Sequence, residues 1–340
     1  MFNSSSGSDL LIQDLMQGSF DPFWRWDQIQ LHVKMALRQQ IAGVQSGSKD
    51  QVRWMQLHEV TDPDFVPNIR KHAAEIDEVS AKDVDASIFA MTQLGRTGDP
   101  VNHSMRTAFV CSLIAREQGM SEEDRIVLVS AALTMNIAML EMQEKLHYRQ
   151  DAPLTDAQRQ LIQQHPIKGR EYLETFGVKT PDWLRAVAEH HEIAGGKGYP
   201  QKLASVFPLA EIIQYADTYC AMTRPRAQRK ALQSNKAAYK LFVNARTANS
   251  SVPGLIVKLL GVYPPGTMVK LANGDVAVVV RRGEQPKAPK VASLCSGTGV
   301  GYPMPLMRDT AVPEFNVIDV VLAEDMKLVF KPAKLFGYDK

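Results

Sequence analysis

The spacing of apolar residues divides the chain into three parts. From about residue 99 to residue 260, apolar side chains recur every three or four positions, the period of a helix with one buried face. Before residue 95 the chain is apolar without a clean period, and after residue 262 short alternating runs indicate strands. The pattern predicts a mainly α protein, with a helical N-terminal region (1–95), a helical domain (96–261) and a small β-rich C-terminal module (262–340).

Local signals mark where several helices begin. Ser121 precedes three acidic residues, which predicts a helix N-cap followed by acids at the positive end of the helix dipole. Thr155 and Gln158 have the spacing of a capping box, and Pro166 is expected to end that helix soon after. Pro181 has the position of a first helical residue.

The last third of the chain contains a strong hairpin signal. Residues 267–271 and 276–280 are rich in β-branched or alternating apolar residues, and Asn273-Gly274 lies between them. Further short strands are expected around residues 315–322 and 326–330.

Charge and cysteine content narrow the class of protein. Among 340 residues, 39 Lys and Arg balance 37 Asp and Glu, so neither nucleic acid nor an anionic membrane is expected as the main partner. The three cysteines are far apart in sequence and fit neither a disulfide framework nor a CxxC metal site. No signal peptide is visible, and the most apolar stretch, residues 126–140, is too short to span a bilayer. A cytoplasmic protein is expected.

Three polar residues fall on apolar helix faces. His191 continues the stripe of the helix after Pro181, and His103 shares a face with apolar residues of its own helix. Asp217 lies on the buried face of a third helix, where an unpaired carboxylate would cost several kcal/mol, so a cation or an imidazole is its expected partner. A histidine on such a face is more often a core residue than a ligand. Periodicity alone therefore leaves both a metal site and a polar core cluster open.

A family resemblance adds to this interpretation. Residues 190–200 read HHEIAGGKGYP, which resembles the HHExxDGxGYP signature of HD-GYP proteins. The run ADTYCAMT at 216–223 resembles the aspartate helix of that family, and His103 and His165 fall where the family has histidines. The resemblance covers roughly residues 99–232.

The resemblance implies an HD-GYP-like helical bundle, two or three bound metal ions and hydrolysis of cyclic di-GMP by metal-activated water. The residues that correspond to metal ligands are His103, His165, His190, His191 and Asp217, with Asp99 as a weaker candidate. The residues expected near the nucleotide are Lys197, Gly198, Tyr199, Pro200, Arg224 and Arg229.

The chain departs from the family at its defining His-Asp pair. The family segment AALLHDIGK reads AALTMNIAM here, so Met135, Asn136 and Met139 replace histidine, aspartate and lysine. A neutral amide is a poor bridge between two cations, and a thioether is a soft ligand unsuited to them. Gly195 also replaces an acid of the signature. No catalytic residue is therefore assigned, and the remaining ligands predict one divalent ion (Fe, Mn or Zn) or none.

Three functions remain as alternatives. The favoured one is a catalytically impaired signalling protein that binds cyclic di-GMP, or a protein such as a diguanylate cyclase, as a receptor or scaffold. The second is an active metal-dependent cyclic di-GMP phosphodiesterase, and the third is an interaction protein without a ligand. Loss of the His-Asp pair argues against the second, and the kept histidines and Gly-Tyr-Pro run argue against the third.

Overall fold

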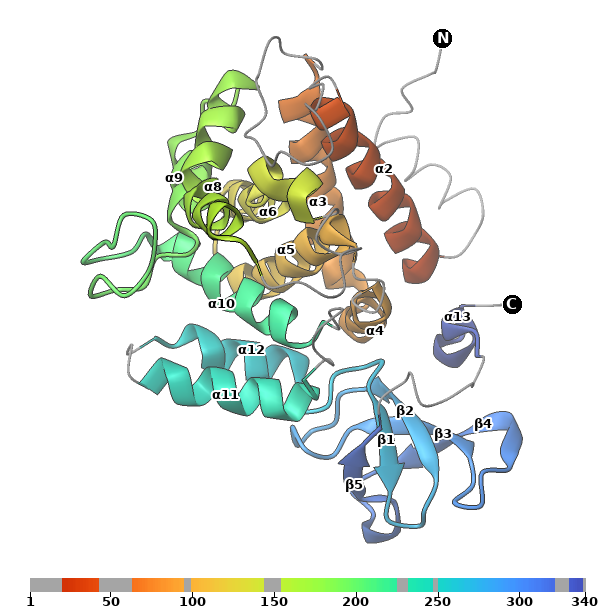
Figure 1. Ribbon diagram of the computed structural model, residues 1–340. Coiled ribbons are helices and arrows are strands. Elements are labelled where there is room, and N and C mark those ends of the chain that lie inside the picture. The colour runs from red at the N-terminus through yellow and green to blue at the C-terminus, as the bar shows by residue number, and fades with distance from the viewer. Residues whose placement is uncertain are drawn as a thin grey trace, which may run out of the picture.

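A computed structural model describes residues 20–42, 63–94, 99–143, 154–224, 232–246, 250–321 and 330–338. Helices dominate, and a small antiparallel sheet follows them near the C-terminus, as the sequence predicted (Figure 1). The helices are α2 (Pro22–Ala42), α3 (Phe65–Lys82), α4 (Val84–Leu94), α5 (Pro100–Glu117), α6 (Glu122–Thr134), η2 (Ile137–Met139), α8 (Asp156–Thr175), α9 (Pro181–Glu189), α10 (Pro208–Met222), α11 (Ser234–Arg246), α12 (Val252–Leu260) and α13 (Pro332–Phe336).

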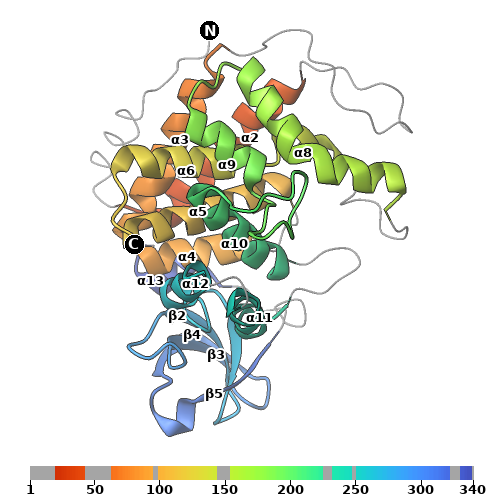
Figure 2. The same ribbon diagram turned by 90° about the vertical axis from the view of Figure 1, so that its left-hand side faces the viewer.

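Helix α5 is the centre of the helical part. Every residue from Pro100 to Ala115 is buried, which is the pattern of a helix surrounded on all sides. Helices α3, α4, α6, α10 and α12 pack against it, and Figure 2 shows it running through the middle of the bundle. One apolar core extends from α2 to α12, so it continues without a break across the boundary predicted near residue 95.

Two predicted helix starts are confirmed at the level of hydrogen bonds. The Ser121 hydroxyl accepts the backbone N–H of Asp124 at 3.2 Å. Thr155 and Gln158 form a reciprocal capping box, with distances of 3.2 Å and 2.9 Å. The prediction that Pro166 soon ends the helix was wrong, because α8 continues to Thr175.

The strands are β1 (Met268–Leu271), β2 (Val276–Arg281), β3 (Lys290–Cys295), β4 (Gly301–Asp309) and β5 (Val317–Val320), in the order β4-β3-β2-β1-β5. The predicted hairpin is present as β1 and β2, with Gly274 at a positive φ of 92°. Strands β3 and β4 were not predicted. Pro303 and Pro305 obscure β4 in the sequence, and an edge strand that pairs only with β3 tolerates them. The strand predicted at 326–330 lies almost wholly outside the described residues.

The sheet contacts the helical part through α4. Phe89 of α4 is fully buried in a cluster with Met268, Val278 and other apolar residues of the sheet. Ion pairs reinforce the contact, among them Arg282 Nε to Asp85 Oδ1 at 2.6 Å. Among the described residues, the stretch Glu122–Gln143 is apolar and long enough to cross a membrane, but most of it is buried inside the bundle. Its role as a core segment accounts for that composition.

Candidate metal centre

His165 is oriented by the proline that follows it. Pro166 has no N–H, so it cannot bond the carbonyl of Ile162, four residues earlier in α8. The Nδ1–H of His165 donates to that carbonyl instead, at 2.6 Å. The helix therefore continues without an orphaned carbonyl, and the Nε2 atom of a fully buried imidazole turns away from its own helix.

His190 is held by the end of α9 in a similar way. Helix α9 ends at Glu189, so the last carbonyls of the helix have no intrahelical partner. Nδ1 of His190 donates to one of them, the Val187 carbonyl, at 2.6 Å. The sequence placed His191, and not His190, on the apolar stripe of this helix. The structure corrects this, because His190 is fully buried and His191, beyond the helix end, is half-buried.

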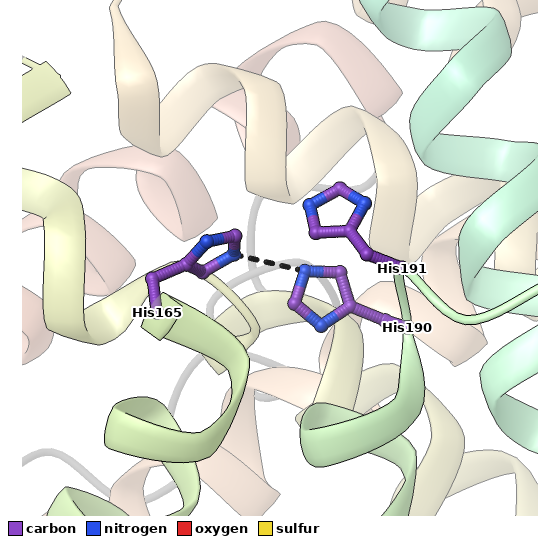
Figure 3. A group of neighbouring side chains, drawn as sticks. All are labelled: His165, His190 and His191. Carbon is purple, nitrogen blue, oxygen red and sulfur yellow. Dashed lines mark hydrogen bonds between the residues drawn. The ribbon is translucent and has the colours of Figure 1, made fainter. Parts of the chain in front are cut away.

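The two Nε2 atoms of His165 and His190 face each other at 3.1 Å (Figure 3). With both Nδ1–H groups donating to carbonyls, each neutral ring presents a lone pair at Nε2. Two lone pairs cannot bond each other, but a cation can satisfy both. Nitrogens bound to one ion at about 2.1 Å lie roughly 3.0–3.4 Å apart at angles of about 90–109°. The observed spacing fits that geometry, and donation of the other ring N–H to a carbonyl is typical of metal-binding histidines.

His191 completes a group of three imidazoles. One ligand atom from each of His165, His190 and His191 lies within 4.8 Å of the others. The ring of His191 also stacks on Tyr199, with centroids 4.7 Å apart and an interplanar angle of 24°. The Gly-Tyr-Pro run therefore lies directly against the histidine group.

His103 and Asp217 form a second pair beside this group. Nε2 of His103 lies 2.6 Å from Oδ1 of Asp217, which confirms that this largely buried acid has an imidazole partner. Nδ1 of His103 is buried without a hydrogen-bond partner. A neutral His103 donating through Nε2 leaves a lone pair at Nδ1, which is again an open acceptor.

Electrostatic interactions connect the pair to the three histidines. Burial opposes ionisation of Asp217, but the hydrogen bond from His103 and the nearby imidazoles of His191 and His190 hold its pKa well below the usual range. Burial and the neighbouring imidazoles of His190 and His191 lower the pKa of His165 strongly. Burial likewise lowers the pKa of His191 to about 3. The imidazoles are therefore neutral, the state in which they can bind a metal ion.

Glu192 does not join the histidines that precede it. Its buried carboxylate accepts backbone N–H groups from Gln201, Lys202 and Leu203, at 2.6, 3.1 and 3.1 Å. The acid thus fixes the returning arm of the loop at residues 193–203. Sequence reasoning missed this role, although an acid directly after two ligands was a signal for it.

Close packing at Gly198 further constrains the loop. A Cβ at Gly198 would lie only 2.3 Å from the backbone nitrogen of Ile193. Gly195, which replaces an acid of the family signature, has a positive φ of 80° and donates its N–H to the Ala204 carbonyl at 3.0 Å. Lys197 is exposed on this loop. The compact loop presents Tyr199 to the histidines and Lys197 to solvent.

The three substituted positions lie in the buried segment after α6. Met135 is completely buried in the core, and Met139 is 9% exposed. Asn136 is 4% exposed, and its Oδ1 has no hydrogen-bond partner. Where the family pattern has ionisable residues, this chain has two thioethers and one open amide oxygen.

Asp99 has partners of its own. Its carboxylate caps α5 by accepting the Val101 N–H at 2.8 Å and pairs with Lys34 Nζ at 2.9 Å. Burial opposes ionisation, but Lys34 and the cap hold the pKa of Asp99 below its usual value. Burial lowers the pKa of His103, and the nearby Arg224 adds to that shift. Arg229 is outside the described residues. A metal role for Asp99 would require it to leave these partners.

Comparison with known proteins finds matches to the helical part of the chain. The family model for the HD domain matches residues 88–249. A cyclic di-GMP phosphodiesterase of Borreliella burgdorferi is 26% identical over 52% of this chain and 47% of its own length. A second such phosphodiesterase, from Pseudomonas aeruginosa, is 27% identical over 62% of this chain and 52% of its own length. Residues 88–249 therefore match an HD domain, similar to those of cyclic di-GMP phosphodiesterases.

The chain is also similar to a phosphodiesterase named for another cyclic dinucleotide and to one solved structure. A 3'3'-cGAMP-specific phosphodiesterase of Vibrio cholerae is 31% identical over 43% of this chain and 32% of its own length. A solved HDG"Y"P protein from Bdellovibrio bacteriovorus matches with a TM-score of 0.48 and 16% identity, over 58% of this chain and 63% of that one. The chain spans about half the length of the two cyclic di-GMP phosphodiesterases.

Proposed function

We propose that this HD-GYP protein is a cytoplasmic receptor for a cyclic dinucleotide, foremost cyclic di-GMP, that holds one metal ion and hydrolyses its ligand very slowly or not at all. The charge of the ligand set carries the proposal. Among the described residues that interact with the three histidines, Asp217 supplies the one carboxylate. Two divalent ions would bring four positive charges to that single negative charge, in a largely buried site.

The nearby acids do not change this balance. Glu192 is bound by three backbone N–H groups, and Glu189 accepts from Phe207 N at 2.8 Å and from Arg185 Nε at 2.7 Å. At position 136 an amide stands where the family has its bridging aspartate. These observations support one ion rather than a closely spaced pair.

His165, His190 and His191 would hold the ion, and iron, manganese or zinc suits imidazole ligands. When bound, the ion would supply positive charge to a phosphate oxygen of the ligand. Tyr199 would offer its ring beside the histidines, and Lys197 would offer a cation to phosphate. A diguanylate cyclase or similar signalling protein would be the partner that binds the nucleotide-bound form of this protein.

The test combines three measurements on protein purified without chelator. Elemental analysis should find no more than one equivalent of iron, manganese or zinc. Calorimetry should detect cyclic di-GMP or 3'3'-cGAMP binding that weakens in Lys197→Ala but not in Lys179→Ala, another exposed lysine. Chromatography after long incubation with manganese should recover the nucleotide intact. Two tightly bound ions, or rapid turnover, would refute the proposal.

An active phosphodiesterase is the second candidate. The three histidines lie together, and two of the relatives are cyclic di-GMP phosphodiesterases. It predicts a metal-dependent linear product that disappears in His190→Ala. The same chromatography therefore distinguishes the two functions.

A further inference from the structure

A cavity of about 380 Å³ lies where the helical part meets the sheet, away from the three histidines. Its walls come from α4, α5, α10, α12 and the start of β1, which are neighbours in Figure 1. Most of the lining is apolar, including Met91, Phe109, Leu260 and Met268. The volume is in the range of sites that hold small molecules, which often lie between structural units.

One wall of the cavity carries a buried positive charge. Arg106 is only 7% exposed, and its guanidinium donates to the Cys220 carbonyl at 3.3 Å and to the Thr223 hydroxyl at 3.0 Å. These two hydrogen bonds cap the C-terminal end of α10. They use only some of the five N–H donors of the Arg106 guanidinium. In the described part of the chain no carboxylate forms an ion pair with Arg106. Arg116 and Arg125, by contrast, share Asp77.

A second polar group that lines the cavity is also without a partner. The Ser234 hydroxyl lines the cavity, and its oxygen is buried without a hydrogen-bond partner. A buried hydroxyl without a partner costs free energy, as does a buried charge without a counterion. Both costs fall if an anionic ligand enters.

We propose that this cavity is a second ligand site, which binds a small apolar carboxylate. The carboxylate would accept hydrogen bonds from Arg106 and Ser234, and the apolar body would pack against Met91, Phe109 and Met268. The site is distinct from the histidine group, although Arg106 follows His103 on α5 by three residues. Binding here does not depend on the metal or on the nucleotide.

Octanoate is the probe, and 1-octanol is its uncharged match. With methionine methyl groups labelled with ¹³C, octanoate at about 1 mM should shift the signals of Met91 and Met268. Met304 and Met307, which are exposed on β4, should not move. Octanol at the same concentration should have little effect, because it cannot neutralise Arg106.

Two variants locate the probe. Arg106→Gln keeps a donor for the end of α10 but removes the charge, and should weaken octanoate binding about tenfold or more. Val321→Trp should fill the cavity and abolish binding while Arg106 is kept, whereas Val312→Trp, at an exposed position, should change nothing. Equal shifts from octanol, no shift with octanoate, or binding that survives Val321→Trp would each overturn the proposal. If Arg106→Gln fails to fold, Val321→Trp and octanol still decide.

Discussion

Restoring the lost residues tests why the metal-site chemistry has changed. In the triple variant Met135→His, Asn136→Asp and Met139→Lys, the family pattern returns to a segment that is almost fully buried. Met135 is 0% and Asn136 4% exposed in the wild type. The aspartate would supply a bridging anion, and the histidine one more nitrogen. We expect the variant to bind more metal per chain than the wild type.

The structure sets the expected size of the effect. Without metal, a new buried carboxylate and ammonium with no built partners should cost about 3–5 kcal/mol. At about 2–4 °C per kcal/mol, the melting temperature should fall by roughly 10 °C. A metal ion at a free concentration of about 100 times its dissociation constant stabilises the folded state by about 2.7 kcal/mol, which should raise the melting temperature by roughly 5–10 °C.

The assay is thermal melting in chelator and in a manganese titration, with elemental analysis after dialysis. Ser130→Asp is the matched control, because Ser130 is fully buried six residues before Asn136 and its hydroxyl oxygen has no partner. The control should lose stability and regain none with manganese. A well-folded triple variant that takes up no more metal than the wild type would refute the reasoning, since the pocket would then differ beyond these three positions.

Three other changes test separate parts of the structure. His190→Ala removes a nitrogen that faces His165 at 3.1 Å, so elemental analysis should show less bound metal than in His32→Ala, a histidine outside the group; equal contents would contradict the site. Asp77→Ala removes the buried acid that two partly exposed arginines share and should lower the free energy of unfolding in urea by about 2–3 kcal/mol; a loss below about 1 kcal/mol would show that the network is not needed. Gly198→Ala forces the loop at residues 193–203 to shift, so calorimetry should show weaker cyclic di-GMP binding at unchanged metal content, and unchanged affinity would separate the loop from the ligand.

Some features of the fold and the site could be predicted because they follow from the chemistry of one residue or of its close neighbours in sequence. The cost of burying Asp217 predicted an imidazole or cation partner, and His103 is that partner. Capping chemistry at Ser121 and Thr155 placed two helix starts correctly, because a cap bonds the helix within three residues.

Contacts distant in sequence were beyond such reasoning. Lys34 pairs with Asp99 from another helix, and no local pattern shows that the acid is already engaged. Pro166 was expected to stop its helix, since the usual rule assumes that the freed carbonyl stays unpaired. Here the side chain of His165 fills that role, so a single dipeptide both continues α8 and aims an imidazole.

The orientation of His165 also helps to distinguish a site that binds an ion from one that binds none. If no ion ever bound, the 3.1 Å approach of His165 and His190 would require a proton between the two Nε2 atoms or a repulsion between their lone pairs. A shared proton would put a positive charge on one ring, and burial opposes that charge by lowering the pKa of both histidines. Their Nδ1 atoms cannot exchange roles with Nε2, because each is committed to a backbone carbonyl. An ion removes the conflict by accepting both lone pairs at once, and the nearby Asp217 carboxylate offsets part of its charge. The arrangement therefore gives a cation a place where it would satisfy two lone pairs that an empty polar cluster leaves in conflict.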